Sequence, residues 1–396
     1  MIKLGVIFGG ESVEHEVSII SAIQAMNKMD SEKYEVIPIY ITKDREWYTG
    51  KSLKDIEVYQ DLDLLKRYSK NVVLYCKKGK FVLQSKGLFK RTIEEIDMAF
   101  PIVHGTNVED GALQGYLKSI GIPFVGSDVS SAAIAQDKIF QKQIYQASNI
   151  PTTDFVWFFD SEYLDDSDKI IKKIEKLKYP VMVKPATLGS SVGINKAHNK
   201  DELVKAIEDA ITYDSKVIVE EVVENLTEVN ISVLGNYEHM QYSVIEQVMT
   251  DNELLTYEDK YIGGSKKNAG ASKGMVSASR KIPADIPEKL KEEVQNIALD
   301  VFKTLNCSGD VRIDFLIDKK KKKVYVNEIN SIPGSLAFYL WEPIDKEYPE
   351  LLDEMINIAI KDYKKKINKV HSFSTNILQG FSGSKGLKGL KGAKNK

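Results

Sequence analysis

The segment Cys307–Pro333, CSGDVRIDFLIDKKKKKVYVNEINSIP, constrains the fold and the chemistry of this chain more than any other. It has the pattern of two strands joined by a lysine-rich turn at residues 318–323, which predicts that the second strand folds back on the first. Side chains two residues apart lie on the same face of a strand. Four polar residues are therefore expected on one face of a hairpin: Arg312, Asp314, Glu328 and Asn330.

This polar face indicates a cation site. The cluster is too polar for a core, and its two carboxylates lie too close to ionise together without a cation. Oxygen ligands with no His or Cys among them suit a hard ion, and Mg²⁺ usually keeps substrate phosphates among its ligands. We therefore expect magnesium here. The alternative is a surface hairpin that carries an exposed salt bridge.

Composition excludes several classes of function. The chain has 55 Lys+Arg against 57 Asp+Glu, a net charge of -2, so nothing favours nucleic acid or an anionic membrane as partner. Two cysteines, Cys76 and Cys307, fit a reducing compartment and form neither a disulfide framework nor a metal tetrad. No apolar run approaches the ~20 residues of a membrane span, and the chain opens on a strand pattern without a leader. A cytoplasmic enzyme acting on small molecules is expected.

The 396 residues suggest about two to four domains of roughly 150 residues each. Strand and helix patterns alternate, which predicts the α/β class. We expect strands at 4–8, 34–41, 72–76, 81–83, 98–103, 123–125, 181–184, 192–196 and 216–219. Helices are expected at 17–29, 112–120 (ended by Gly121) and 200–211. The predicted units are 1–135, an open-sheet domain; 136–215; 216–370; and 371–396, a mobile basic tail rich in Gly and Lys.

Two features indicate a phosphate site in the second unit. The turn Gly189–Gly193 (GSSVG) would let backbone N–H groups approach a phosphate, and its two hydroxyls add donors. Lys138 and Lys184 lie beside this unit and could supply positive charge. An ordinary hairpin turn and two solvated lysines are the alternatives. No Walker A motif occurs in the chain.

Two other loops carry hypotheses. Glu14 precedes the first helix, where its carboxylate could capture a substrate amine or simply cap the helix. The long glycine-bearing loop Tyr257–Ser279 has the pattern of either a lid or a disordered segment. A catalytic cluster nearby favours the lid.

Seven motifs then occur in an order typical of one family. They are GGESVEHEVS at 9–18, HG at 104–105 with EDG at 109–111, QDK at 136–138, VKP at 183–185 with GSSVG at 189–193, KY at 260–261, RIDF at 312–315 and NEINSIPG at 327–334. Over residues 2 to about 360 the chain resembles D-alanine:D-alanine ligases. This resemblance implies the ATP-grasp fold behind a Rossmann-like N-terminal domain, so that 136–215 and 216–370 are its small and C-terminal catalytic domains. It also implies a homodimer.

The resemblance implies a two-step reaction. ATP phosphorylates the carboxylate of a first D-alanine, and the amine of a second attacks the acyl phosphate, giving a dipeptide for peptidoglycan. By this resemblance, Asp314, Glu328 and Asn330 would bind Mg²⁺, with Mn²⁺ as a substitute, and Arg312 and the Gly334 N–H would stabilise the oxyanion. Glu14 would bind the ammonium of the first D-alanine and form a hydrogen-bonded trio with Ser190 and Tyr261. ATP would contact Lys138, Lys184, Ser191, Glu220, Val223, Glu228 and Lys260, and the amino acids would contact His104, Tyr339 and Leu340.

Three departures from the family pattern bear on these roles. The run Asn225–Thr227 before Glu228 is one residue longer than usual, and Val108 replaces the usual glycine before Glu109. The largest change is Tyr339, which stands where the family has a serine that binds the carboxylate of the second substrate. A phenol there could still bind a carboxylate, but it would reshape the pocket.

Two other functions therefore stay open. The reshaped segment 335–342 favours a related ligase that joins a different amine or amino acid. A nucleotide-binding module without catalysis is the third reading. The intact polar cluster of the hairpin argues against it, because such a module has no need of a buried charge cluster.

Overall fold

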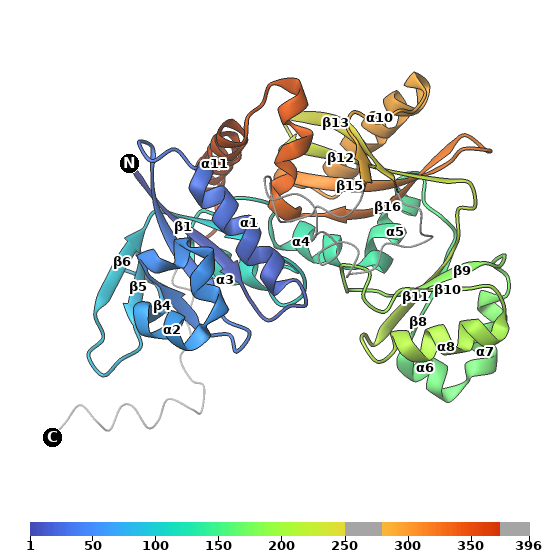
Figure 1. Ribbon diagram of the computed structural model, residues 1–396, viewed down its shortest axis with the longest axis horizontal. Coiled ribbons are helices and arrows are strands. Elements are labelled where there is room, and N and C mark those ends of the chain that lie inside the picture. The colour runs from blue at the N-terminus through green and yellow to red at the C-terminus, as the bar shows by residue number, and fades with distance from the viewer. Residues whose placement is uncertain (250–278, 373–396) are drawn as a thin grey trace, which may run out of the picture. The chain divides into compact units, whose positions relative to one another are not determined.

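A computed structural model describes residues 1–249 and 279–372 of the chain (Figure 1). Residues Met1–Ile360 make one compact unit. Three sheets with packed helices form this part, so the expected α/β class is confirmed. Within the described ranges, no helix has the length and apolar character needed to cross a membrane. The predicted tail lies almost wholly outside the described residues.

The first sheet has the strand order β6-β5-β4-β3-β2-β1-β7. Its strands are β1 (Ile2–Gly9), β2 (Tyr34–Ile41), β3 (Trp47–Thr49), β4 (Lys70–Lys77), β5 (Lys80–Ser85), β6 (Thr92–Ile96) and β7 (Met98–Ile102). β1 pairs in parallel with β2 and β7, which explains its nearly continuous apolar run. The helical segments are α1 (His15–Lys28), η1 (Lys51–Lys54), η2 (Ile56–Gln60), α2 (Leu62–Tyr68) and α3 (Ala112–Ile120).

Two predictions in this region have opposite outcomes. Helix α3 has the expected bounds, and Gly121 ends it in the left-handed region with φ of 82°. The strand expected at 123–125 is wrong, because only Phe124 forms an isolated bridge, to Ala99. The chain turns at Gly126 immediately afterwards, with φ of 100°, so a ladder cannot extend.

The second sheet has the antiparallel order β10-β9-β11-β8. Its strands are β8 (Phe155–Phe159), β9 (Val181–Pro185), β10 (Asn195–Ala197) and β11 (Lys216–Glu221), and its helices are α6 (Asp160–Asp165), α7 (Ser167–Ile174) and α8 (Lys200–Ala210). Figure 1 shows these helices together beside the sheet, and apolar side chains from α6, α7 and α8 share one core with β8, β9 and β11.

Two boundaries expected for this region are wrong. β10 begins at Asn195 and not at residue 192, because the turn that starts at Gly189 extends through the preceding residues. β11 does not begin a third unit at residue 216, since it lies between β9 and β8 with Val217–Val219 fully buried. The boundary expected at 216 therefore falls inside this sheet. The other domain boundaries stay predictions.

The third sheet has the antiparallel order β14-β13-β12-β15-β16. Its strands are β12 (Leu226–Gly235), β13 (Met240–Met249), β14 (Ser279–Lys281), β15 (Gly309–Asp318) and β16 (Lys323–Asn330). Helices α4 (Val129–Gln136), α5 (Lys138–Ala147) and α10 (Glu288–Thr304) pack on it, and η3 (Gly334–Leu340), η4 (Glu342–Ile344) and α11 (Tyr348–Ile367) follow β16. The residues of β12 that face this core are Val229, Ile231 and Val233, so the alternate residues, such as Asn230, face the other way.

A buried aspartate joins the segment after β16 to this sheet. Asp310 Oδ1 accepts hydrogen bonds from Ser232 Oγ at 2.6 Å and from Trp341 Nε1 at 3.1 Å. Its Oδ2 has no hydrogen-bond partner within the described part of the chain. Burial raises the pKa of Asp310 to about 8, against these hydrogen bonds and nearby cations, which lower it. The carboxyl is therefore mostly protonated at neutral pH.

Asp310→Asn should make the protein more stable than wild type at about pH 8. In the unfolded chain the pKa of an aspartate is about 3.9, which is below the pKa of Asp310 in the folded protein. The contribution of Asp310 to the free energy of unfolding is therefore greatest at low pH, and it decreases as pH rises from about 4 through the folded pKa. The amide keeps an oxygen for both donors and does not titrate. We expect the free energy of unfolding of the variant, measured with urea, to increase relative to that of wild type by at least about 1 kcal/mol as pH rises from about 5 to 8.

The matched control is Asp165→Asn, at an exposed position at the end of α6. It should show no such gain. An Asp310→Asn variant whose stability follows the wild-type pH dependence would contradict a buried, neutral carboxyl at this position.

Candidate active site

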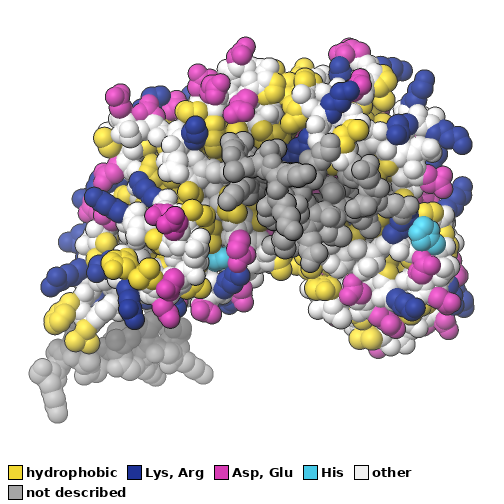
Figure 2. Space-filling model, viewed as in Figure 1, with side chains coloured by type: hydrophobic (Ala, Val, Ile, Leu, Met, Phe, Trp, Pro, Cys, Tyr) yellow, Lys and Arg dark blue, Asp and Glu magenta, His cyan; other side chains and the backbone are white. Residues whose placement is uncertain are grey.

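One cavity of about 900 Å³ is lined by most of the predicted site residues. Strands of the second and third sheets line it, together with α1 and the loops that follow β1 and β7 of the first sheet. This volume is within the range of small-molecule sites. The predicted residues that line it are Glu14, His104, Lys138, Lys184, Ser190, Ser191, Glu220, Val223, Glu228, Arg312, Asp314, Glu328, Asn330 and Gly334. Lys260, Tyr261 and nearly all of the predicted lid lie outside the described residues. Over the visible face, acidic and basic side chains are interspersed (Figure 2).

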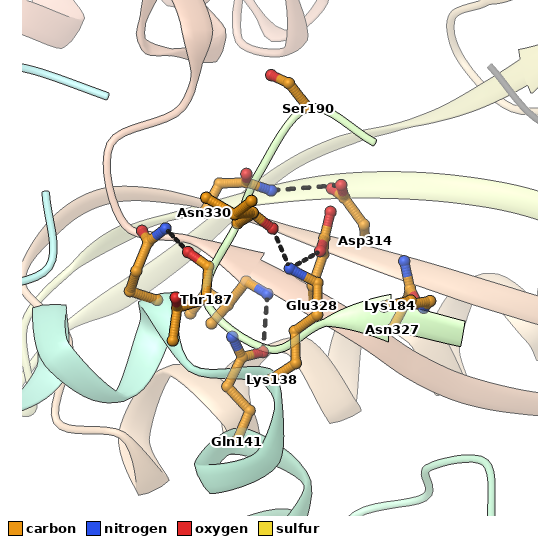
Figure 3. Close-up of polar contacts among 12 residues, drawn as sticks. Lys138, Gln141, Lys184, Thr187, Ser190, Asp314, Asn327, Glu328 and Asn330 are labelled. Carbon is orange, nitrogen blue, oxygen red and sulfur yellow. Dashed lines mark hydrogen bonds and ion pairs between the residues drawn. The ribbon is translucent and has the colours of Figure 1, made fainter. Parts of the chain in front are cut away.

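The hairpin of β15 and β16 presents the predicted polar face. Asp314 lies directly opposite Glu328, and Arg312 lies opposite Asn330. The guanidinium of Arg312 donates two hydrogen bonds to the carboxylate of Asp314, from Nε at 2.7 Å and from Nη2 at 2.9 Å. Asn330 Nδ2 donates to Asp314 Oδ2 at 3.3 Å (Figure 3). The expected shared face is therefore confirmed, and the exposed-hairpin alternative is wrong because Arg312 and Asp314 are only 12% and 7% exposed.

A β-bulge in this hairpin brings in a residue that the sequence reasoning missed. Phe315 pairs with Val326 while Asp314 pairs with Glu328, so Asn327 is an extra residue in β16. The bulge turns Asn327 toward the cavity, where its Oδ1 lies 3.3 Å from Lys184 Nζ. The signal in the sequence is the adjacent polar pair Asn327–Glu328, which interrupts the alternation of the strand.

The oxygen atoms of this face fit a magnesium ion. Two carboxylates and one amide from paired strand positions form the donor set, and no His or Cys is among them. Groups of three or more His, Cys, Asp or Glu suited to a metal do not occur in the described residues. Mg²⁺ is commonly held by one or two carboxylates and completes its shell with substrate phosphates and water. Asp314, Glu328 and Asn330 would supply such a set.

Lys138 and Lys184 project into the cavity from separate elements. Lys138 opens α5, whose N-cap Asp137 accepts from the N–H groups of Ile139 and Phe140. Its Nζ donates to Leu188 O at 2.7 Å and lies 3.4 Å from Glu328 Oε2 (Figure 3). The two lysine side chains are only 7% and 11% exposed. The alternative that they are solvated surface groups is therefore wrong.

Glu220 lies between two lysines on the cavity wall. Its Oε2 is 3.3 Å from both Lys184 Nζ and Lys142 Nζ. Burial acts to raise the pKa of Glu220, but the two lysines outweigh it and hold the pKa below its usual value. Lys142 is almost completely buried and also donates to Thr152 Oγ1 and Thr153 Oγ1, at 2.7 and 2.9 Å. Nothing in the sequence distinguishes it from a surface lysine.

The turn after β9 reaches the first loop of the chain. Ser190 Oγ donates to Glu14 Oε1. A Cβ atom on Gly189 would lie 2.8 Å from Glu14 Oε2, so any other residue here would force the Glu14 carboxylate to shift. Glu14 is the N-cap residue of α1, yet its side chain makes no capping hydrogen bond, and the simple capping alternative is wrong. Of the three residues predicted to contact one another, Glu14 and Ser190 do so, while Tyr261 lies outside the described residues.

His104 and Glu109 form the floor of the cavity near Arg312. Burial lowers the pKa of His104 to about 4, so its imidazole is neutral at pH 7. Glu109, another residue that the reasoning assigned no role, accepts from the N–H groups of Gly105 at 3.0 Å and Ile332 at 2.9 Å. Burial, with the charge of Glu14, raises the pKa of Glu109 to about 7 despite these bonds. Glu109 therefore joins the loop after β7 to the loop after β16.

The segment predicted to bind the second substrate is placed differently from expectation. Tyr339 and Leu340 do not line the cavity, and Leu340 is fully buried. The phenol of Tyr339 instead donates to Glu246 Oε2 at 3.3 Å, because the left-handed backbone of residues 335–337 turns the segment away. Glu246 and Arg280 line the cavity at this position, and the sequence reasoning missed both.

Comparison with known proteins gives one consistent result. The family models described as D-ala D-ala ligase N-terminus and D-ala D-ala ligase C-terminus match residues 3–127 and 144–357. A relative from Thermosipho melanesiensis, called D-alanine–D-alanine ligase, is 40% identical over 381 residues, which cover 96% of this chain and 99% of the relative.

Two solved structures extend the comparison. The D-alanine-D-alanine ligase from Coxiella burnetii has a TM-score of 0.77 at 29% identity, covering 92% of this chain and 96% of that one. The VanG D-Ala:D-Ser ligase from Enterococcus faecalis has a TM-score of 0.75 at 30% identity, covering 90% and 99%.

Proposed function

Because this chain belongs to the D-alanine–D-alanine ligase family of ATP-dependent ligases with the ATP-grasp fold, we propose that it joins two D-alanine molecules into a dipeptide for peptidoglycan synthesis. The observation that carries the proposal is the paired geometry of the hairpin. Arg312, Asp314, Glu328 and Asn330 lie on one cavity wall in matched register. The activity requires a phosphate-binding cluster and an oxyanion site side by side, and the residues of this wall would supply both.

In the first step the γ-phosphoryl group of ATP is transferred to the carboxylate of the first D-alanine, and ADP leaves. Glu14 would bind the ammonium of this D-alanine, because Ser190 holds its carboxylate at the cavity. Lys138 and Lys184 would contact the phosphates. Further contacts with ATP are assigned to Ser191, Glu220, Val223, Glu228 and Lys260, with Glu228 at the ribose. When bound by Asp314, Glu328 and Asn330, Mg²⁺ or Mn²⁺ would neutralise phosphate charge.

In the second step the amine of the second D-alanine attacks the acyl carbon, loses a proton, and displaces phosphate. The negative charge that develops on the carbonyl oxygen needs fixed donors nearby. Arg312 and the backbone N–H of Gly334 would supply them. Glu109 accepts from Ile332 N–H and Ser331 Oγ, so it would hold the loop that leads to Gly334 in place.

A ligase of the same family with another acceptor is the second candidate. The observation that favours it is that Tyr339 does not line the cavity. Glu246 and Arg280 line it instead, at the place where the second substrate was expected to bind. The similar structure from Enterococcus faecalis is itself called a D-Ala:D-Ser ligase.

ADP release with a panel of D- and L-amino acids, with products identified by mass spectrometry, tests the proposed function. We expect the dominant product to be D-alanyl-D-alanine. A mixed dipeptide as the dominant product would favour the second candidate. ATP turnover that never yields a dipeptide would contradict ligase activity.

The metal assignment predicts that Glu328→Ala and Asn330→Ala abolish ligation. Both remove a ligand while leaving the core on the other face of the sheet intact, so the circular dichroism spectrum and the melting temperature should change little. Lys323→Ala, at the start of the same strand and exposed, is the control and should keep activity. Near wild-type turnover in either ligand variant would show that the metal is held elsewhere.

The oxyanion role predicts a large effect of Arg312→Lys. Losing one such donor typically costs about 10²–10³ in rate, and a compact ammonium cannot reproduce the planar fork that grips Asp314. We therefore expect kcat to fall at least a hundredfold, measured by coupled ADP release at saturating substrates. A lysine variant with wild-type kcat would mean that positive charge alone is required.

The family resemblance also suggests a homodimer in the cytoplasm. Light scattering with size-exclusion chromatography would measure the mass of the assembly, and cell fractionation would locate it.

A further inference from the structure

We propose that Arg280 binds the carboxylate of the acceptor amino acid and thereby selects acceptors that carry one. This inference rests on the proposed ligase function and concerns the end of the cavity where Tyr339 was expected.

Two contacts place Arg280 at the cavity wall. It lies on the edge strand β14, and its Nε is 3.1 Å from Glu246 Oε1 on β13. Its guanidinium carbon lies 4.9 Å from the ring centroid of Tyr339. The arginine side chain is 19% exposed and that of Glu246 only 2%. An ion pair and a cation–π contact thus fix a partly buried guanidinium that faces the cavity.

This guanidinium lies close to the reaction centre. Glu246 pairs with Asn230 across β13 and β12, and Asn230 pairs with Asp314 across β12 and β15. Neighbouring strands lie about 4.8 Å apart, so Glu246 is roughly 10 Å from Asp314 along this row. The charges of Arg280 and Arg312 both influence Tyr339, lowering its pKa against burial, which raises it to about 12. An acceptor bound between these two guanidinium groups would place its carboxylate at Arg280 and its amine on the side of Arg312.

The other groups nearby are less suited to this carboxylate. Asp314 engages the Nε–Nη2 edge of Arg312, and the rest of this guanidinium is assigned to the oxyanion. The phenol of Tyr339 donates to Glu246 and lies outside the cavity wall. Arg280 lines the cavity with its guanidinium, whose Nε is paired with Glu246. A planar guanidinium is also the group best matched to a carboxylate.

The competing explanation is a structural ion pair that only fastens β14 to β13. A structural role would change turnover with every acceptor alike. A carboxylate-binding role would change the preference for acceptors with a carboxylate over those without one. The selectivity ratio is therefore the decisive quantity, and it does not depend on how much folded enzyme a variant yields.

The test is a competition between D-alanine and D-alaninamide as acceptors, with D-alanine as donor. Mass spectrometry measures the ratio of D-alanyl-D-alanine to D-alanyl-D-alaninamide. Wild type should favour D-alanine, and Arg280→Gln should reduce this ratio by about ten- to a hundredfold, the value of a hydrogen bond to a charged group. The KM for the donor should be unchanged. Arg280→Lys, which keeps the charge but not the fork, should fall in between.

Lys281→Gln is the matched control. It removes the same charge from the next residue of β14, where the side chain is 51% exposed and pairs with Asp285. Its product ratio should equal that of wild type. An unchanged ratio in Arg280→Gln, or a wild-type enzyme without preference for D-alanine over its amide, would overturn the proposal.

The same experiment separates this inference from the proposed function. If the wild-type enzyme ligates a different amino acid and rejects D-alanine as acceptor, the proposed acceptor is wrong. The competition is then run with that amino acid and its amide, and loss of the carboxylate preference in Arg280→Gln would still support the role of Arg280.

Discussion

The antiparallel pairing of β15 with β16 is the constraint on which the rest of the site depends. Its register places Asp314 opposite Glu328 and Arg312 opposite Asn330. A slip of one residue would turn these side chains toward the core and bring apolar residues into the cavity. The apolar face of β15 and β16 packs against α10. The register that buries this face therefore also turns the polar face toward the cavity.

The second organising feature is charge compensation around the cavity. Four ion pairs join cations to carboxylates on different elements: Lys138 with Glu328, Lys142 and Lys184 with Glu220, and Arg280 with Glu246. A fifth, Arg312 with Asp314, lies within β15. A lone buried charge would be costly, whereas a paired one can be kept partly buried and oriented. The pairs therefore hold several cations at one wall, where phosphates and carboxylates of substrates would be recognised.

Contacts between distant segments complete the site. Ser190 reaches Glu14 across 176 positions of sequence, and Glu109 reaches Ile332 across 223. Each contact depends on a local backbone feature, such as Gly189, whose missing Cβ leaves room for the carboxylate of Glu14. Loops thus bring Glu14, Ser190 and Glu109 to a cavity whose metal and oxyanion side chains lie on strands β15 and β16.

The sequence by itself determined the features that depend on neighbours along the chain. Alternation in β15 and β16 predicted their polar face, and Gly121 predicted the end of α3, because strand period and helix capping are local properties. Only the tertiary structure decided the position of β11, the burial of Lys142, the contact of Tyr339 with Glu246 and the place of Arg280 at the cavity. These depend on which distant segment covers each side chain, and one sequence does not specify that partner.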